Sequence, residues 1–234
     1  MALVRDGADA IDVGAAASNP QAAFVDPVEE IRRLEPVVHA LQRAVIAVSV
    51  DSFSPAVQRW ALTRHVDFLN DTRGFPESSI YPQLAETRSR LIVMHAVQDR
   101  GRADRTPGDA DTILDHVVRF FESRLARLGA AGVARERCLL DPGMGLFLGT
   151  GAEPSIAILR QLRTLRARFG LPVLVGVSRK SFVGTLSGRP IDERGPATLA
   201  AELFAVRQGV DWIRTHDVRG LRDAIAVQRA LEGG

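Results

Sequence analysis

The stretch LPVLVGVSRKSF, residues 171–182, decides the fold class. Residues 172–177 form an unbroken apolar run, as expected for a strand that is covered on both faces of a parallel sheet. Polar residues follow at once, from Ser178 to Lys180. The same order recurs along the chain, which predicts strands at residues 8–13, 45–50, 66–69, 91–94, 138–140, 172–177 and 212–214.

Helices are predicted between these strands. Asp26 can cap a helix that has Pro27 at its first position. Apolar residues from Leu114 to Leu128 recur at spacings of three and four, which predicts an amphipathic helix that ends near Gly129. Strands that alternate with helices indicate an α/β protein with a parallel sheet.

A closed barrel is the fold that such a chain favours. The (β/α)8 TIM barrel takes eight units in about 250 residues, whereas the strands predicted above supply one unit fewer. We therefore expect a TIM barrel that lacks the first strand and its loop, with residues 1–6 as the tail of a helix that ends at Gly7. Because there is no linker and no shift in composition, residues 1–234 are expected to be one domain.

Composition excludes several classes of protein. Hydrophobic residues make up 46% of the chain and charged residues 25%, which is ordinary for a globular domain. The longest uncharged apolar runs, residues 44–50 and 171–177, are much shorter than the roughly 20 residues that span a bilayer, so no membrane partner is expected. The start of the chain does not have the pattern of an export signal. The one cysteine, Cys138, fits a reducing compartment, and we expect a cytoplasmic protein.

The basic charge of the chain comes almost entirely from arginine. Lysine and arginine total 30, Lys180 is the single lysine, and the net charge is +2. The sequence pI of 9.3 therefore reflects strongly basic arginine, and we expect no nucleic-acid partner. An ammonium is a compact point charge, whereas a guanidinium is a broad planar fork. Lys180 is thus either a residue that arginine cannot replace or a leftover surface lysine.

Polar side chains follow every predicted strand, which is where TIM-barrel enzymes place their chemistry. They are Asp12, Asp51, Asn70 with Asp71, His95, Asp141, residues 178–180, and Arg214 with His216. Asp51, Asn70 and Asp141 could converge on a flat heterocycle with ring N–H and amino donors, since a carboxylate accepts two such donors at once. The alternative for Asp51 and Asp141 is capping of the helices that follow.

Arg214 and His216 end the last predicted strand, in a part of the barrel that often holds a phosphate. Arginine suits two-point contact with phosphate and histidine adds a donor. The alternative is an ordinary surface turn. The turn at residues 141–145 lacks the third glycine of a dinucleotide site, and no HExxH, CxxC or GxSxG occurs.

Taken in order, these segments resemble dihydropteroate synthase. The matching stretches are IDVG (11–14), SNP (18–20), SVDS (49–52), LND (69–71), VMH (93–95), DPGMG (141–145), SRKS (178–181) and RTHD (214–217). They extend from one end of the chain to the other. Residues 14–18, 70–76 and 180–182 look most like the mobile, sulfonamide-insensitive synthases of resistant bacteria.

This resemblance implies a transferase of folate biosynthesis that joins 6-hydroxymethyl-7,8-dihydropterin diphosphate to 4-aminobenzoate and releases diphosphate. An aryl amine is a weak nucleophile, so in this family the diphosphate ionises first and leaves a pterin-stabilised cation. The implied substrate-binding residues are Asp12, Ser18, Asp51, Asn70, Met94, Asp141, Gly145, Ser178, Lys180 and Phe182. Lys180, Arg214 and His216 take the catalytic roles. The last two would hold the diphosphate as fixed donors.

The resemblance also implies Mg2+ and a homodimer. The magnesium ligand of the family is an asparagine of the first strand unit, so no metal ligand is expected within this chain. Residues 16–20 read AASNP where the family usually has Glu-Ser-Thr-Arg-Pro, which alters the expected aminobenzoate and sulfonamide contacts. Phe182 is a candidate steric block against sulfonamides. The alternative is that Phe182 packs into the barrel wall.

Two other functions fit parts of the pattern. A folate-binding methyltransferase domain would share the acidic pterin contacts, but it has no diphosphate for Arg214, His216 and Lys180 to hold. A non-catalytic pterin-binding fragment would follow from the expected absence of the first unit. The residues at the last two strand ends favour the synthase.

Overall fold

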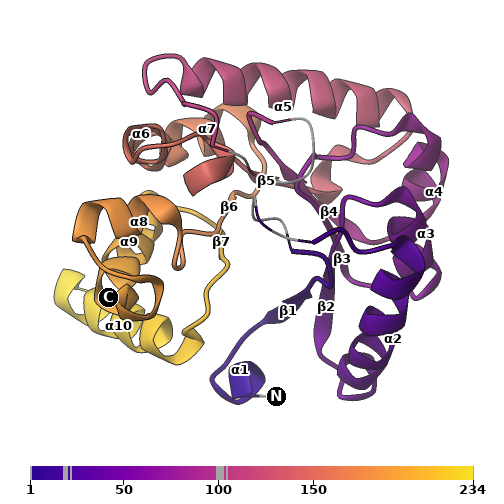
Figure 1. Ribbon diagram of the computed structural model, residues 1–234, viewed down its shortest axis with the longest axis horizontal. Helices are drawn as coiled ribbons and strands as arrows, with labels where there is room; N and C mark the ends of the chain where they lie inside the picture. The colour runs from indigo at the N-terminus through magenta and orange to yellow at the C-terminus, as the bar shows by residue number, and fades with distance from the viewer. Residues whose placement is uncertain (1, 18–20, 22, 99–102, 104, 234) are drawn as a thin grey trace.

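Figure 1 shows the protein as a computed structural model, which describes residues 2–17, 21, 23–98, 103 and 105–233. The strands are β1 (Ala10–Val13), β2 (Ala47–Asp51), β3 (Phe68–Asp71), β4 (Arg90–Met94), β5 (Cys138–Asp141), β6 (Leu174–Val175) and β7 (Trp212–Ile213). Each overlaps a strand predicted from the sequence. The β6 strand is shorter than predicted, although hydrogen bonds from Trp212 N to Val173 O and from Arg214 N to Val175 O extend its pairing with β7.

The strands pair in parallel and in chain order. β1 to β5 form one sheet, and β6 pairs with β7. Leu140 forms a bridge with Val173 and donates its N–H to Pro172 O at 2.9 Å, which joins β5 to the segment that leads into β6. Within the described residues, no strand pairing joins β7 to β1. The predicted parallel α/β architecture is confirmed.

Helices surround the strands, as Figure 1 shows. They are α1 (Ala2–Arg5), α2 (Pro27–Arg43), α3 (Pro55–Thr63), α4 (Tyr81–Glu86), α5 (Ile113–Ala130), α6 (Glu153–Arg160), α7 (Leu162–Phe169), α8 (Ser181–Ser187), α9 (Gly195–Arg207) and α10 (Val218–Glu232), with 3-10 turns η1 (Ser78–Ile80), η2 (Arg135–Arg137), η3 (Gly145–Phe147) and η4 (Ile191–Glu193). Asp26 caps α2 as predicted, since its side chain accepts from Val28 N at 2.9 Å. The predicted amphipathic helix is α5.

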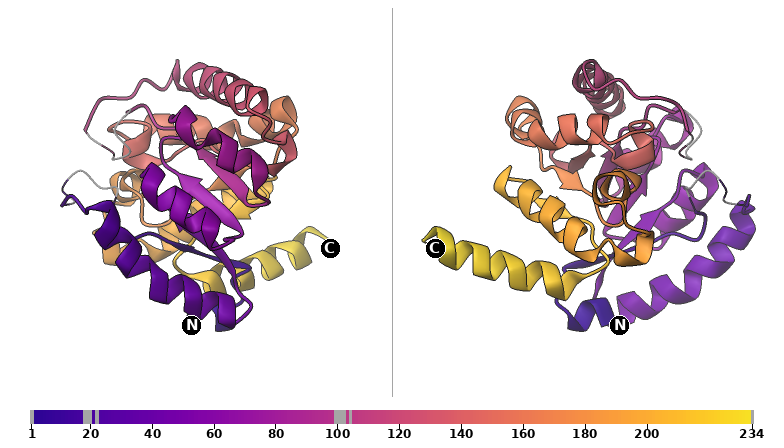
Figure 2. Two further views of the ribbon diagram at one scale, coloured as in Figure 1. Left: turned by 90° about the vertical axis from the view of Figure 1, so that its right-hand side faces the viewer. Right: turned by 60° about the vertical axis from the view of Figure 1, so that its left-hand side comes forward.

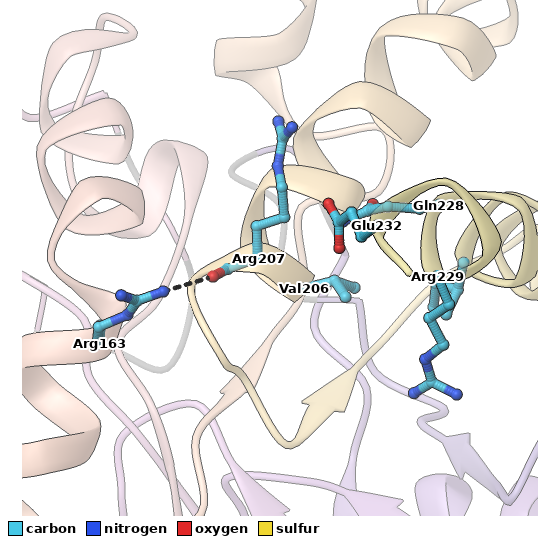
Figure 3. A pocket seen from close by; sticks show the side chains of 7 residues that line it. Arg163, Val206, Arg207, Gln228, Arg229 and Glu232 are labelled. Carbon is cyan, nitrogen blue, oxygen red and sulfur yellow. Dashed lines mark hydrogen bonds between the residues drawn. The ribbon is translucent and has the colours of Figure 1, made fainter. Parts of the chain in front are cut away.

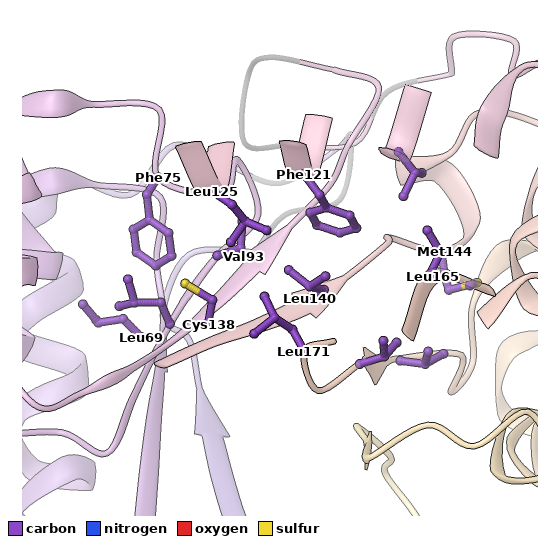
Figure 4. Close-up of a cluster of buried hydrophobic side chains, with 14 of the residues drawn as sticks. Leu69, Phe75, Val93, Phe121, Leu125, Cys138, Leu140, Met144, Leu165 and Leu171 are labelled. Carbon is purple, nitrogen blue, oxygen red and sulfur yellow. The ribbon is translucent and has the colours of Figure 1, made fainter. Parts of the chain in front are cut away.

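The main core lies between the strands and the helices around them (Figure 4). Leu69, Val93 and Leu140 point outward from β3, β4 and β5, and Phe121 and Leu125 of α5 pack in the same cluster. Burial of one such large side chain contributes about 1.5–3 kcal/mol. This packing explains why the strands read as apolar runs, since their outward face is covered by helices.

A second cluster consists of the alternate strand residues. Phe68, Ile92, Leu139 and Leu174 are buried together, and Trp212 packs against them. Successive side chains of a strand point to opposite faces, so this cluster fills the inside of the sheet. The Arg90 guanidinium lies 5.4 Å from the Phe68 ring centroid. Apolar side chains therefore fill the end of the sheet at which the strands begin. The polar residues that follow the strands lie at the opposite end.

Figure 2 shows helix α10 projecting from the rest of the molecule, with the C-terminus at its far end. It packs against α9, and its buried residue is Leu221. Among the described residues, no helix combines the length and apolar character required to span a membrane.

Candidate active site

The carboxyl ends of the strands bring the predicted site residues to one end of the molecule. Register pairs Asp51 of β2 with Asn70 of β3, and Met94 of β4 with Asp141 of β5. Asn70 and Met94 are 1% exposed and Asp141 is 2% exposed. Asp12 lies on β1, and its register partner is Ser49 of β2. The strand-end side chains that the sequence pattern marked are therefore neighbours.

Arg214 links the last strand to the first two. Its Nη1 donates to Asp12 Oδ2 at 2.9 Å and lies 3.4 Å from Asp51 Oδ2. Asn70 Nδ2 donates to the same Asp12 oxygen at 3.2 Å. One cation thus bridges two carboxylates that are far from it in the sequence. The alternative that Asp51 caps the following helix is wrong, because Ser54 occupies the N-cap of α3.

Two buried oxygen atoms in this network lack a partner in the described part of the chain. They are Oδ1 of Asp12 and Oδ1 of Asn70. A buried acceptor without a donor costs free energy, about 1–3 kcal/mol. A ligand that presents N–H donors would satisfy both atoms, so the acceptor arrangement favours a donor-rich heterocycle.

Burial shifts the protonation of these groups. Burial, and then the charge of Asp12, raises the pKa of Asp51 to about 7, against the opposing charges of Arg214 and Lys180. Burial also raises the pKa of Asp141, opposed first by the charge of Arg214. Burial and the charge of Arg214 lower the pKa of Lys180 to about 8. Perturbed groups of both signs in one place are typical of functional sites.

The turn after β5 approaches Lys180 closely. Asp141 Oδ1 accepts from Gly143 N at 2.8 Å, so it shapes this turn and does not cap a helix. Gly145 has a φ of 65°, and a Cβ there would lie 3.3 Å from the Lys180 Cβ and 2.9 Å from Ser181 Oγ. Only glycine combines this backbone conformation with such an approach.

Phe147, at the end of the same turn, completes the surroundings of Lys180. The Nζ of Lys180 lies 5.2 Å from the centroid of the Phe147 ring, which is a cation–π distance. No sequence pattern points to this residue. A lone phenylalanine two positions after a glycine-rich turn carries no local signal, and only the fold brings its ring to the lysine.

Ser178 and His216 form a pair at the ends of β6 and β7. Ser178 Oγ lies 2.8 Å from His216 Nδ1 and 3.4 Å from its backbone N. His216 is exposed. Burial of part of the ring, followed by the charges of Arg179, Arg214 and Lys180, lowers the pKa of His216. The lowered pKa favours the neutral ring, and an anion bound beside these cations would oppose this shift.

Two predicted substrate contacts are not placed in this group. Ser18 lies outside the described residues, as do the next two residues of its motif. Phe182 is 1% exposed and belongs to the main hydrophobic core. This position fits the alternative, packing in the barrel wall, and the expected contact of Phe182 with the substrate stays a prediction.

A separate hollow of about 520 Å³ lies between α7, α9 and α10 (Figure 3). Its lining includes Arg163, Arg207 and Arg229, and Arg163 Nη2 donates to Arg207 O at 2.9 Å. None of the strand-end residues lines this hollow. The candidate active site is thus defined by its polar network and not by the size of a cavity.

The described strand-end residues do not form a metal site of their own. Among the described residues, no group of three or more histidine, cysteine, aspartate or glutamate side chains is arranged to hold a metal ion. Asp12 and Asp51 share the Arg214 cation instead. The residues present do not fit a magnesium site of their own, and no catalytic step is assigned to one.

Comparison with known proteins first gives the class of the protein. The model of the family "Pterin binding enzyme" matches residues 1–216. The solved dihydropteroate synthase of Xanthomonas albilineans with 4-aminobenzoic acid matches with a TM-score of 0.89 and 32% identity, over 100% of this chain and 82% of that chain. The Yersinia pestis synthase with a sulfonamide drug matches with a TM-score of 0.90 and 33% identity, over 100% and 84%. These matches confirm a TIM-barrel pterin-binding enzyme.

Sequence relatives then narrow the class. The chain is 53% identical to the Escherichia coli dihydropteroate synthase type-2 over 230 residues, which cover 98% of this chain and 84% of the relative. It is 49% identical to the type-1 enzyme of Pseudomonas aeruginosa, over 98% and 82%, and 32% identical to the synthase of Neisseria meningitidis, over 98% and 81%. The chain belongs to the dihydropteroate synthase family.

Proposed function

We propose that the strand-end site condenses 6-hydroxymethyl-7,8-dihydropterin diphosphate with 4-aminobenzoate. The observation that carries this proposal is one partly buried network, in which Arg214 bonds to Asp12 and Asp51 and Asn70 donates to Asp12. The network offers acceptors to a pterin, and its cation lies beside them. A folate-binding methyltransferase needs the acceptors but has no use for the cations at the last strand ends.

In this proposal, buried acceptors hold the pterin. The unpartnered oxygens of Asp12 and Asn70 take ring and amino donors. Asp141, whose Oδ1 already accepts from Gly143 N, offers its other oxygen to a further donor. Asp51, whose pKa is about 7, can hold or release a proton at the pH of the reaction. Met94, 1% exposed, packs beside the pterin. Because these groups are fixed before the substrate binds, they select the heterocycle at little ordering cost.

The cations act on the leaving group. The bond between the pterin methylene carbon and the diphosphate oxygen breaks, and the electron pair leaves with the diphosphate. Arg214 and His216 donate to the departing oxygens, and the Lys180 ammonium adds a further positive charge. The aminobenzoate nitrogen then bonds to the methylene carbon and releases a proton to water. Fixed donors placed where charge develops lower the barrier.

In this proposal Lys180 and Ser178 also contact 4-aminobenzoate, as the family resemblance implies. Ser178 is 8% exposed and is bonded to His216, so it joins the diphosphate side to the aminobenzoate side. Mg2+, expected from the family, would accompany the diphosphate as its counter-ion. The homodimer stays a prediction that light scattering of the purified protein would test.

The test is condensation by the purified chain. Both substrates are supplied with magnesium, and dihydropteroate and diphosphate are measured by chromatography. Equal amounts of the two products, lost in Lys180→Met, would support the proposal. Pterin binding without turnover would identify a non-catalytic pterin-binding protein. Methyl transfer from a methylated folate to a cobalamin would identify the methyltransferase.

We further propose that the enzyme tolerates sulfonamides. The support is its identity of 46–53% to the type-1, type-2 and type-3 synthases, against 32% to the Neisseria meningitidis enzyme. The inhibition constant of sulfamethoxazole, compared with the Michaelis constant for the aminobenzoate substrate, decides this point. An inhibition constant at or below that Michaelis constant would contradict tolerance and leave the synthase proposal intact.

A further inference from the structure

The backbone before Lys180 has a conformation that side chains rarely adopt. Arg179 has a φ of 59°, in the left-handed region. This conformation disfavours any residue with a Cβ and persists only where surrounding contacts fix it. Since Arg179 directly precedes Lys180, the contacts that fix this turn also set the direction in which the Lys180 side chain leaves the backbone.

Two of these contacts come from Arg194, at the start of α9. Its Nη1 donates to Arg179 O at 3.0 Å and to Lys180 O at 3.3 Å. Its Nε donates to Arg189 O at 3.0 Å, so the guanidinium is fixed on a third side. Thr198 Oγ1, on the next turn of α9, accepts from Arg179 N at 3.3 Å. The peptide groups on both sides of Arg179 are therefore tied to α9.

Helix α8 has a glycine where this guanidinium crosses it. A Cβ at Gly184 would lie 2.2 Å from Arg194 Nη2 and 2.3 Å from Arg194 Cζ. Gly184 lies within α8 and has no positive φ, so the backbone itself does not need glycine there. Alanine is the better helix former. The close approach of Arg194 explains why this helix has glycine at this position.

The contacts of the Lys180 ammonium depend on the direction in which its side chain leaves the backbone. Its Nζ lies 5.2 Å from the centroid of the Phe147 ring. The charged groups that shift its pKa are Arg214, Asp141 and Asp51. Arg194 bonds to the backbone, so it acts on Lys180 through position and not through charge.

We propose that Arg194 is a positioning residue for Lys180. Its guanidinium holds the two carbonyl groups of the strained turn, and Gly184 leaves the space that it occupies. The catalytic consequence of this arrangement rests on the proposed function of Lys180, whereas the structural claim does not. Arg194→Lys is expected to fail as a replacement, because a single ammonium cannot reproduce the planar fork that reaches several carbonyls.

The composition of the chain makes the test direct. Lys180 is the one lysine in 234 residues, so growth on 13C-lysine labels a single side chain, whose NMR signal can be titrated. In Arg194→Met and in Gly184→Ala, the pKa of Lys180 is expected to rise by at least one unit from about 8, since a displaced side chain loses its burial. The kcat/KM for condensation is expected to fall at least about tenfold, mostly through kcat.

Matched controls separate positioning from general damage. Gly129→Ala changes a glycine inside α5 that has no other atom within 4 Å of an added Cβ. Arg163→Met removes an arginine that bonds to a backbone carbonyl far from the strand ends. Both are expected to leave the Lys180 titration unchanged.

An unchanged Lys180 signal and pKa in folded Gly184→Ala overturns the proposal, whatever the activity does. This variant also decides the question if Arg194→Met fails to fold. If the wild type has no condensation activity but the Lys180 titration moves in the variants as expected, the positioning inference stands and the proposed function fails.

Discussion

Arg214→Met should destabilise the protein in a pH-dependent way. The arginine is the one cation bonded to both Asp12 and Asp51, and it connects the edges of β1 and β7 where no strand pairing occurs in the described residues. Methionine keeps much of the length and apolar stem but removes the charge. The change leaves two carboxylates near each other without their shared cation.

The size of the loss follows from the distances. At 2.9 Å and 3.4 Å, unit charges attract by about 5–6 kcal/mol at an effective dielectric constant of about 20. Desolvation of the three groups offsets most of this attraction, and breaking a buried pair costs about 3–5 kcal/mol. The Asp12 and Asp51 side chains keep 20% and 25% exposure. We therefore expect the lower end, about 3 kcal/mol, at alkaline pH.

The sign of the pH dependence follows from Asp51. Its pKa is already raised to about 7, and Arg214 opposes that rise, so the variant should have a still higher value. Between pH 7 and that higher value, the folded variant keeps a proton on Asp51 that the folded wild type and the unfolded chains have lost. The stability of the variant therefore falls as the pH rises through this range. On lowering the pH toward 7, the deficit should shrink by up to about 1.4 kcal/mol per pH unit. Below pH 7 the deficit should stay constant.

Urea unfolding, followed by the fluorescence of Trp60 and Trp212, measures the deficit at about pH 6.5 and about pH 8.5. Arg214→Met combined with Asp51→Asn is the control, because it removes the unpaired carboxylate and should be less destabilised at the higher pH. A deficit below about 1 kcal/mol at about pH 8.5, or one that is equal at the two pH values, would refute the assigned coupling.

Three further substitutions test the site and its support. Asp141→Ala should weaken binding of a pterin analogue by about 2–5 kcal/mol in a folded protein, and unchanged affinity in calorimetry would remove Asp141 from the site. Lys180→Arg should lose most turnover with a nearly normal Tm, since the guanidinium keeps the charge but not the shape; near-normal turnover would make the lone lysine a product of composition. Phe182→Ala should cost about 3–5 kcal/mol of stability as a core cavity, with equal effects on 4-aminobenzoate and sulfamethoxazole; a selective gain for sulfamethoxazole would return Phe182 to the pocket.

Local patterns predicted the positions of the strands and the edge that carries the chemistry. An apolar run that ends in a polar residue is a property of adjacent positions, so Asp51 and Asp141 could be assigned to strand ends without knowing the fold. Parallel strands then place such residues at one end of the sheet. The lone Lys180 stood out from composition alone.

The same patterns could not assign Phe182 or find Arg194. Phe182 follows Lys180 closely, but the first turn of α8 directs its ring into the core. Arg194 is one of many arginines, and its bonds to Arg179 O and Lys180 O span 15 and 14 positions. Adjacency to Lys180 cannot tell a pocket position from a core position for Phe182, and no local pattern marks Arg194.

Hydrophobic periodicity and turn chemistry act over a few positions, so the amino-acid sequence predicts the succession of strands and helices and the residue types at the strand ends. Which side chains touch depends on how distant segments fold together. Arg214 reaches Asp12 across 202 positions because the curved sheet brings β7 back beside β1. The raised pKa of Asp51 and the lowered pKa of Lys180 follow from that closure, since burial and neighbouring charges exist only once distant strand ends share one space.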